Sequence, residues 1–149
     1  MQIKLIQPSP MLALPQSDGN GTLMWAVRYS KNNIGTVKLL LADSRVNPAA
    51  NNNEAIREAS FRGHTGVVKL LLADSRVNPA ANNSIAIRYA SRCGCTEVIR
   101  LLLADSRADP SAVNNEVIKN AYYWGYTDIV KLLLADGRAD PAASWQGTS

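Results

Sequence analysis

The chain has 149 residues, of which 46% are hydrophobic and 19% charged, with a formal net charge of +4 and a pI near 9.3. This composition excludes a disordered chain, and the apolar runs are far shorter than the roughly 20 residues that cross a bilayer. Cys93 and Cys95 are too few for a disulfide framework, and the N-terminus lacks the order of a signal peptide. We therefore expect an intracellular protein, in the cytoplasm, without a membrane anchor.

Residues 1–21 form a non-repeating leader that contains Pro8, Pro10 and Pro15, each of which interrupts a helix. Residues 3–6 faintly resemble residues 37–40. The leader is therefore either the degenerate second helix of a preceding unit or an irregular cap. In both cases we expect its apolar side chains to cover the open face of the first repeat.

From residue 22 onward one pattern recurs four times, centred on three leucines followed by Ala-Asp. The repeated aspartates stand 31 residues apart, at Asp43, Asp74, Asp105 and Asp136. This fixed period predicts a stack of repeats, because one such unit is too small to bury its own leucines. We expect the array to cover residues 22–141, followed by a tail at residues 142–149. Its units are expected at residues 22–51, 52–82, 83–113 and 114–141.

Each unit contains the pattern of two helices, most clearly at residues 52–72. The core face of the first helix follows the i, i+3, i+4, i+7 spacing with mostly small residues: Ile56, Ala59, Ser60 and Gly63. In the second helix, valines and leucines spread over a wide arc, which indicates a helix flanked on both sides. The first unit is one residue out of register, with Val27 matching Ala59.

Capping residues mark the expected helix boundaries. We expect N-caps at Asn53, Ser84 and Asn115 for the first helices and at Thr65, Thr96 and Thr127 for the second. Turn glycines in the left-handed conformation are expected to close the first helices, at Gly63, Gly94 and Gly125.

The loops between units begin with an Asn-Pro or Asp-Pro pair, which stops the second helix. An asparagine then recurs at Asn52, Asn83 and Asn114. We interpret these amides as a ladder bonded to backbone groups of neighbouring loops. A polar loop without such bonds is the alternative.

The positive charge of the repeats is matched locally. Four arginines stand two residues after the repeated aspartates: Arg45, Arg76, Arg107 and Arg138. This arrangement predicts Asp–Arg pairing and argues against a calcium ladder or a phosphate-binding stripe. We therefore do not expect nucleic acid as the main partner.

No constellation of catalytic, cofactor-binding or metal-binding residues is visible. The single histidine, His64, falls in a turn, where Cys95 and Tyr126 replace it in later units, and we expect a structural role. Cys93 and Cys95 lack the further ligands that a structural zinc site needs. We expect no enzyme activity, no cofactor and no metal.

The segment from Gly63-His64 to Leu72, preceded by residues 55–59, resembles an ankyrin repeat. The likeness covers roughly residues 22–141, although the family's Thr-Pro-Leu-His opening is replaced here by residues 54–57. The resemblance implies an all-α solenoid of about four stacked helix-turn-helix repeats with short Pro/Asn loops. Small residues on the first helices favour a concave face on that side. Because the unit is short, we expect the projecting hairpin to be reduced to a tight Pro-Ala-Ala-Asn loop.

The resemblance also implies a binding surface where the repeats differ, just before the turn glycine. The candidate partner-binding residues are Tyr29, Phe61, Arg62, Tyr89, Arg92, Tyr123 and Trp124. Aromatic and arginine side chains are typical anchors of protein interfaces. Polar contacts are expected from Asn53, Ser84 and Asn115. For Trp124 the alternative is a bulky terminal layer that shields the core.

Beyond Pro141 the repeat pattern ends, and Trp145 stands where the loop asparagine is expected. The outer face of the last second helix then has three explanations. Trp145 packs over it, the chain self-associates through it, or the chain is part of a longer array.

The function that the sequence favours is a non-enzymatic scaffold that binds a protein partner of unknown identity through the concave surface. One alternative is a recruiting adaptor within a larger ankyrin protein. The other is a basic nucleic-acid-binding module, whose binding would collapse with salt.

Overall fold

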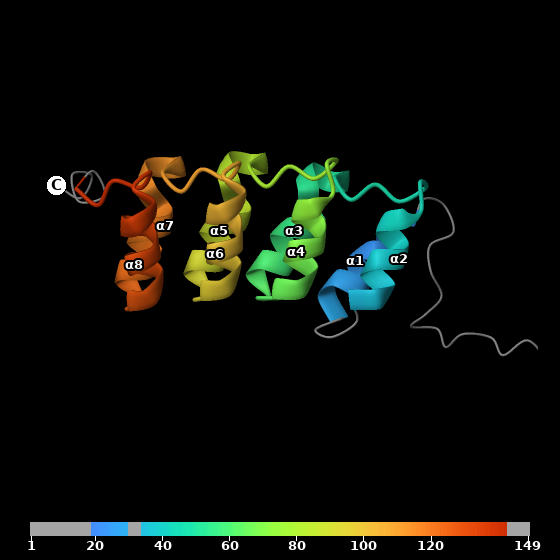
Figure 1. The fold of residues 1–149 in the computed structure, drawn as a ribbon, viewed down its shortest axis with the longest axis horizontal. Coiled ribbons are helices and arrows are strands. Elements are labelled where there is room, and N and C mark those ends of the chain that lie inside the picture. Colours follow the sequence, from blue (N-terminus) through green and yellow to red (C-terminus); the bar gives the residue numbers. More distant parts are fainter. Residues whose placement is uncertain (1–18, 30–33, 143–149) are drawn as a thin grey trace, which may run out of the picture.

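The computed structural model describes residues 19–29 and 34–142, which form eight helices in four pairs (Figure 1). The pairs are α1 (Asn20–Tyr29) with α2 (Ile34–Ala42), α3 (Ala50–Phe61) with α4 (Thr65–Ala73), α5 (Ala81–Arg92) with α6 (Thr96–Asp105), and α7 (Ala112–Tyr123) with α8 (Thr127–Asp136). No strand occurs in these residues. Residues 1–18 of the predicted leader and residues 143–149 of the predicted tail, including Trp145, lie outside the described residues.

The helix pairs stack along the long axis of the molecule (Figure 1). The odd-numbered helices α1, α3, α5 and α7 contact one another in chain order, and the even-numbered helices form a second row beside them. The main contacts join the partners of one pair or neighbours within one row. The predicted all-α solenoid of four stacked repeats is confirmed.

The core lies between the two rows, and the odd-numbered helices supply both small and large residues to it. The large ones are Leu23, Ile56, Ile87 and Ile118, each at most 1% exposed. Fully buried alanines face it from the odd-numbered helices: Ala26, Ala59, Ala90 and Ala121. Of the three repeated leucines only the middle one is fully buried in the later units, at Leu71, Leu102 and Leu133. The outer two leucines of these units are partly buried against the core, except Leu134, which is 49% exposed.

Three consecutive left-handed residues shape each loop. In the second unit Asn51, Asn52 and Asn53 have φ values of 54°, 56° and 61°, and residues 82–84 and 113–115 repeat this turn. Asparagine tolerates the left-handed conformation because its short polar side chain can bond locally. This tight turn agrees with the predicted reduction of the hairpin.

A ladder of side chains does connect the loops, but one position later than predicted. Backbone N–H groups of Asn78, Asp109 and Asp140 donate to Asn53, Ser84 and Asn115 at 2.7–2.8 Å. The predicted ladder residues Asn52, Asn83 and Asn114 are exposed instead. The prediction of Asn53, Ser84 and Asn115 as N-caps is therefore wrong, because these side chains hold the following loop.

Asn20 takes the ladder position in the first unit, where its Oδ1 accepts a hydrogen bond from the N–H of Asn47 at 2.7 Å. Asn20 precedes Asn53 by 33 residues, so the first unit is two residues out of the 31-residue register and not one. In this register Tyr29 aligns with Arg62.

The turns within each pair agree only in part with the prediction. Gly63, Gly94 and Gly125 have φ values of 69°, 71° and 72°, so the left-handed turn glycines are confirmed. The threonine caps are wrong, because α4, α6 and α8 begin at the threonines themselves and have no side-chain cap. His64 has a structural contact, with Nδ1 2.8 Å from the Val27 carbonyl oxygen of the preceding unit.

In the second, third and fourth units the Asp–Arg pair bridges two units. The Asp105 carboxylate accepts hydrogen bonds from Arg107 Nε at 2.6 Å and Nη2 at 2.9 Å. The same guanidinium donates to the carbonyl oxygens of Val77 at 2.9 Å and Leu72 at 3.0 Å in the preceding unit. Leu72 lies in the last turn of α4, whose carbonyls have no partner within the helix. The predicted pairing is confirmed, and it also caps the neighbouring helix.

The same contact recurs along the stack. Arg76 donates to the carbonyls of Leu41 and Val46, and Arg138 to those of Leu103 and Ala108. The hydrogen bonds from the arginines hold the pKa of Asp74, Asp105 and Asp136 below the ordinary value, and Arg45 lowers the pKa of Asp43 to about 2. The carboxylates thus remain charged and keep the guanidinium groups oriented.

Val113 is a β-branched residue in the left-handed turn, at φ 53° and 45% exposed. We expect Val113→Asn to raise the free energy of unfolding by about 1 kcal/mol, because asparagine relieves the steric cost of this conformation. Urea denaturation measures the change. The reverse substitution at the equivalent position, Asn82→Val, is expected to lower stability by a similar amount, and equal stability of all three proteins would contradict the strain.

Arg107→Ala removes the bonds between two units and is expected to lower the free energy of unfolding by about 2 kcal/mol, the usual cost of losing hydrogen bonds from a charged group. Arg45 forms the same pair with Asp43 but contacts no preceding unit within the described residues. Arg45→Ala is therefore the matched control and is expected to change stability little. Equal losses in both variants, measured by urea denaturation, would show that only the local pair matters.

The lowered carboxylate pKa values predict the response to acid. A group whose pKa is lower in the folded state contributes stability above its unfolded pKa, and this contribution is lost as the pH falls through the folded value. We expect the free energy of unfolding to decline below about pH 4. Asp105→Asn is expected to flatten this decline, whereas Glu97→Gln on the exposed side of α6 is not. Urea titrations at a series of pH values would refute the assignment if both variants kept the wild-type slope.

Candidate protein-interaction surface

The structure places six of the seven predicted binding residues at the ends of the odd-numbered helices. Four are the last residues of α1, α3, α5 and α7, and two directly follow α3 and α7. We call this set the helix-end row: Tyr29, Phe61, Arg62, Arg92, Tyr123 and Trp124. All six side chains are exposed, up to 80% at Tyr123. Because the four helices lie side by side, their ends line up along one edge of the stack (Figure 1).

Aromatic contacts organise this row. Phe61 meets Tyr89 of the next unit edge to face, with ring centroids 5.7 Å apart, so the structure brings these two predicted residues together. Tyr123 and Trp124 form a second edge-to-face pair at 4.9 Å. Trp124 is 53% exposed. Such pairs hold the rings in fixed orientations and leave apolar area accessible.

Tyr29 packs against Trp25 of the same helix, with ring centroids 5.7 Å apart. Trp25 was not among the predicted residues. Its spacing of four residues from Tyr29 places both on one helix face, and that aromatic spacing is the signal that could have found it.

Ion pairs neutralise the carboxylates on the odd-numbered helices. Arg28 of α1 reaches Glu54 at 3.0 Å and Glu58 at 3.7 Å on α3, and Arg62 also pairs with Glu58 at 3.0 Å. Arg88 of α5 pairs with Glu116 of α7 at 2.6 Å. Arg62, a predicted binding residue, is therefore partly engaged within the chain.

Three cations on the same helices form no ion pair within the described residues: Arg57, Arg92 and Lys119. Since Glu54, Glu58 and Glu116 are all paired, the odd-numbered helices present unbalanced positive charge among their aromatic rings. Of these three cations, only Arg92 was predicted as a binding residue.

The polar residues predicted to add contacts are not available for a partner. Asn53, Ser84 and Asn115 are at most 9% exposed, and their side chains hold the loops. Their residue type is that of a surface contact, but the left-handed turn directs them inward.

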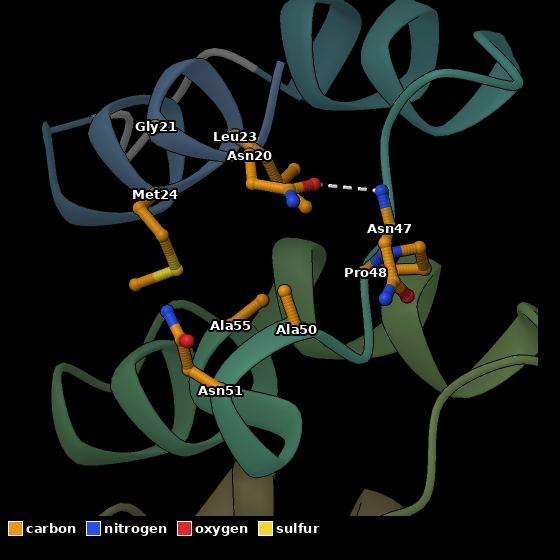
Figure 2. Close-up of a pocket in the computed structure, with 9 residues that line it drawn as sticks. All are labelled: Asn20, Gly21, Leu23, Met24, Asn47, Pro48, Ala50, Asn51 and Ala55. Atoms are coloured by element: carbon orange, nitrogen blue, oxygen red, sulfur yellow. Dashed lines mark hydrogen bonds between the residues drawn. The ribbon is translucent and has the colours of Figure 1, made fainter. Parts of the chain in front are cut away.

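A cavity of about 210 Å³ lies between α1 and the beginning of α3. Figure 2 shows the residues that line it, with the Asn20–Asn47 hydrogen bond on one side of the group and Met24 and Asn51 on the other. None of its lining residues carries an acid, a base or a thiol. The cavity therefore offers no group for proton transfer or nucleophilic attack.

The described residues contain no group of three or more His, Cys, Asp or Glu side chains that could hold a metal ion. Burial raises the pKa of both the Cys93 and the Cys95 thiol, which keeps them in the less reactive protonated form. None of the helices in this part of the chain has the length and apolar character needed to cross a bilayer.

A family model described as ankyrin repeats (3 copies) matches residues 23–114, which is more than half of the chain. The match begins at Leu23 within α1 and extends through α6 to Asn114 in α7. No curated protein and no solved structure matches the chain.

Proposed function

The chain belongs to the ankyrin-repeat family, and from this premise we propose that it is a non-enzymatic scaffold that binds a partner protein through the helix-end row and Tyr89. Ankyrin repeats are generally protein–protein interaction modules and are typically non-enzymatic. The observation that carries the proposal is the row of exposed aromatic and arginine side chains on neighbouring helix ends.

The energetics of the row support this choice. Exposed aromatic rings such as Phe61 and Tyr123 each offer a large apolar area at low conformational cost. The ring contacts of Phe61 with Tyr89 and of Tyr123 with Trp124 restrict their positions, so little entropy is lost when a partner binds. The internal aromatic contacts therefore preorganise the surface.

The charge of this surface indicates the chemistry of the partner. The unpaired cations Arg57, Arg92 and Lys119 favour a segment that carries carboxylates, and the adjacent rings favour apolar side chains within it. We propose an acidic segment with apolar anchors as the bound element.

Nucleic acid is less well supported. Eight arginines of the described residues form ion pairs with carboxylates, so their charge is matched within the chain: Arg28, Arg45, Arg62, Arg76, Arg88, Arg100, Arg107 and Arg138. The six described cations without an ion pair are divided between the two rows of helices: Arg57, Arg92 and Lys119 on the odd-numbered helices, and Lys38, Lys69 and Lys131 on the even-numbered ones. A nucleic acid bound along one row would therefore neutralise only three of them, which gives a small counterion release and a weak salt dependence.

The proposal is tested by capture of partners with the immobilised chain, followed by measurement of the affinity for the recovered protein. The triple variant Phe61→Ala, Arg92→Ala and Trp124→Ala is expected to weaken binding at least roughly a hundredfold, because truncated interface anchors each cost substantial free energy. Its melting temperature is expected to stay near the wild-type value, since all three side chains are exposed.

The matched control changes three exposed cations on the even-numbered helices: Lys69→Ala, Arg100→Ala and Lys131→Ala. This control is expected to retain the partner. Loss of binding in the control with full binding in the triple variant would assign the interface to the opposite row. If the immobilised chain instead captures nucleic acid, and moderate salt releases it, the partner is a nucleic acid and not a protein.

A further inference from the structure

Neighbouring units are connected by a joint, which is the contact of an aspartate-held arginine with two backbone carbonyls of the preceding unit. The first unit carries the arginine half of this joint. Arg45 is held by Asp43 in the same fork as the later arginines, with Nη2 2.6 Å from Oδ2. Its side chain is 82% exposed, whereas those of the three arginines that dock on a preceding unit are 35–41% exposed. The guanidinium of Arg45 is therefore oriented for docking but contacts no other unit of the described chain.

The last unit carries the other half. Within the stack, the carbonyl oxygens of Leu103 and Ala108 accept hydrogen bonds from Arg138 at 3.1 Å. The equivalent groups one repeat later belong to Leu134 and Ala139. In residues 19–29 and 34–142 no side chain donates to either of these carbonyls.

Apolar side chains show the same complementarity. Leu39 is 75% exposed, but its equivalents Leu70, Leu101 and Leu132 are partly buried against the core. Leu134 is 49% exposed, but its equivalents Leu41, Leu72 and Leu103 are partly buried as well. Because a neighbouring unit covers these equivalents, Leu39 and Leu134 mark the two outward faces of the stack.

We propose that the chain self-associates head to tail, with Arg45 and Leu39 of one copy docked on α8 of a second copy. The contact would repeat between chains the joint that connects units within the chain: the guanidinium on the carbonyls of Leu134 and Ala139, and Leu39 against the last layer. Such a contact is heterologous, so it leaves one end of each copy, and therefore both ends of the dimer, free for further growth. It goes beyond the binding of a partner protein because it uses the ends of the stack and not the helix-end row.

Sedimentation equilibrium of the full chain, from about 1 µM to about 1 mM, tests this proposal. The average mass is expected to rise with concentration above the 16.1 kDa of one chain. Arg45→Ala is expected to weaken association at least roughly tenfold, because it removes hydrogen bonds from a charged group. Arg100→Ala is the matched control, since Arg100 is also exposed and paired but lies on α6, away from both ends.

A mixing experiment separates head-to-tail contact from a symmetric dimer. The double variant Leu39→Glu and Arg45→Ala blocks the first face, and Leu134→Glu blocks the last. Each variant alone is expected to stay monomeric, whereas their mixture is expected to form a 1:1 pair and nothing larger, because each retains one working end. Melting curves by circular dichroism establish that both variants fold, and Leu134→Ser replaces Leu134→Glu if the latter does not.

A mass of 16.1 kDa at every concentration would overturn the proposal and would assign the last face to the chain's own residues 143–149 or to a further repeat. Association that both end variants leave unchanged would also overturn it. The triple variant of the helix-end row is expected to associate like the wild type, so failure of one proposal is distinguishable from failure of the other.

Discussion

The stack depends on a guanidinium group that is oriented by its own unit and used by the preceding one. A helix ends with carbonyl groups that have no partner, and in a stack these ends are partly shielded from water. The Asp105 carboxylate holds Arg107 so that it donates to two carbonyls of the preceding unit. Because the aspartate fixes the planar fork in advance, less side-chain entropy is lost on docking. The leucines bury apolar surface in the core, and the guanidinium group fixes how neighbouring units align.

This joint explains why the repeated residues say little about the partner. The aspartate and arginine are engaged between units, the ladder side chains hold the loops, and the middle leucine fills the core. Each of these groups has the same task in the second, third and fourth units, where it recurs every 31 residues. Positions such as Phe61, Arg92 and Tyr123 have no such task, and their side chains remain free to differ and to meet another molecule.

The features that depend on local spacing could be predicted from the sequence. The 31-residue period predicts the stack, an aspartate two residues before an arginine predicts their pairing, and a glycine after a helix predicts the left-handed turn at Gly63. The ladder was misplaced because Asn53 has the residue type of an N-cap, and only the left-handed backbone turns it toward Asn78. Contacts between units, such as Arg88 with Glu116, leave no mark in the spacing, so the charge balance of the surface required the structure.

A contact between units that uses the same residues each time can be continued by a further unit at either end of the stack. Within one chain the next unit is covalently linked, so its effective concentration is high and the contact between the units stays formed. Between chains the same contacts must overcome the loss of translational and rotational freedom, which makes them dependent on concentration. In the proposed self-association, one set of interactions would therefore both stabilise the stack and join the ends of two chains. Charged or polar side chains on the outer faces would prevent such association, but Leu39 and Leu134 are exposed there and are apolar.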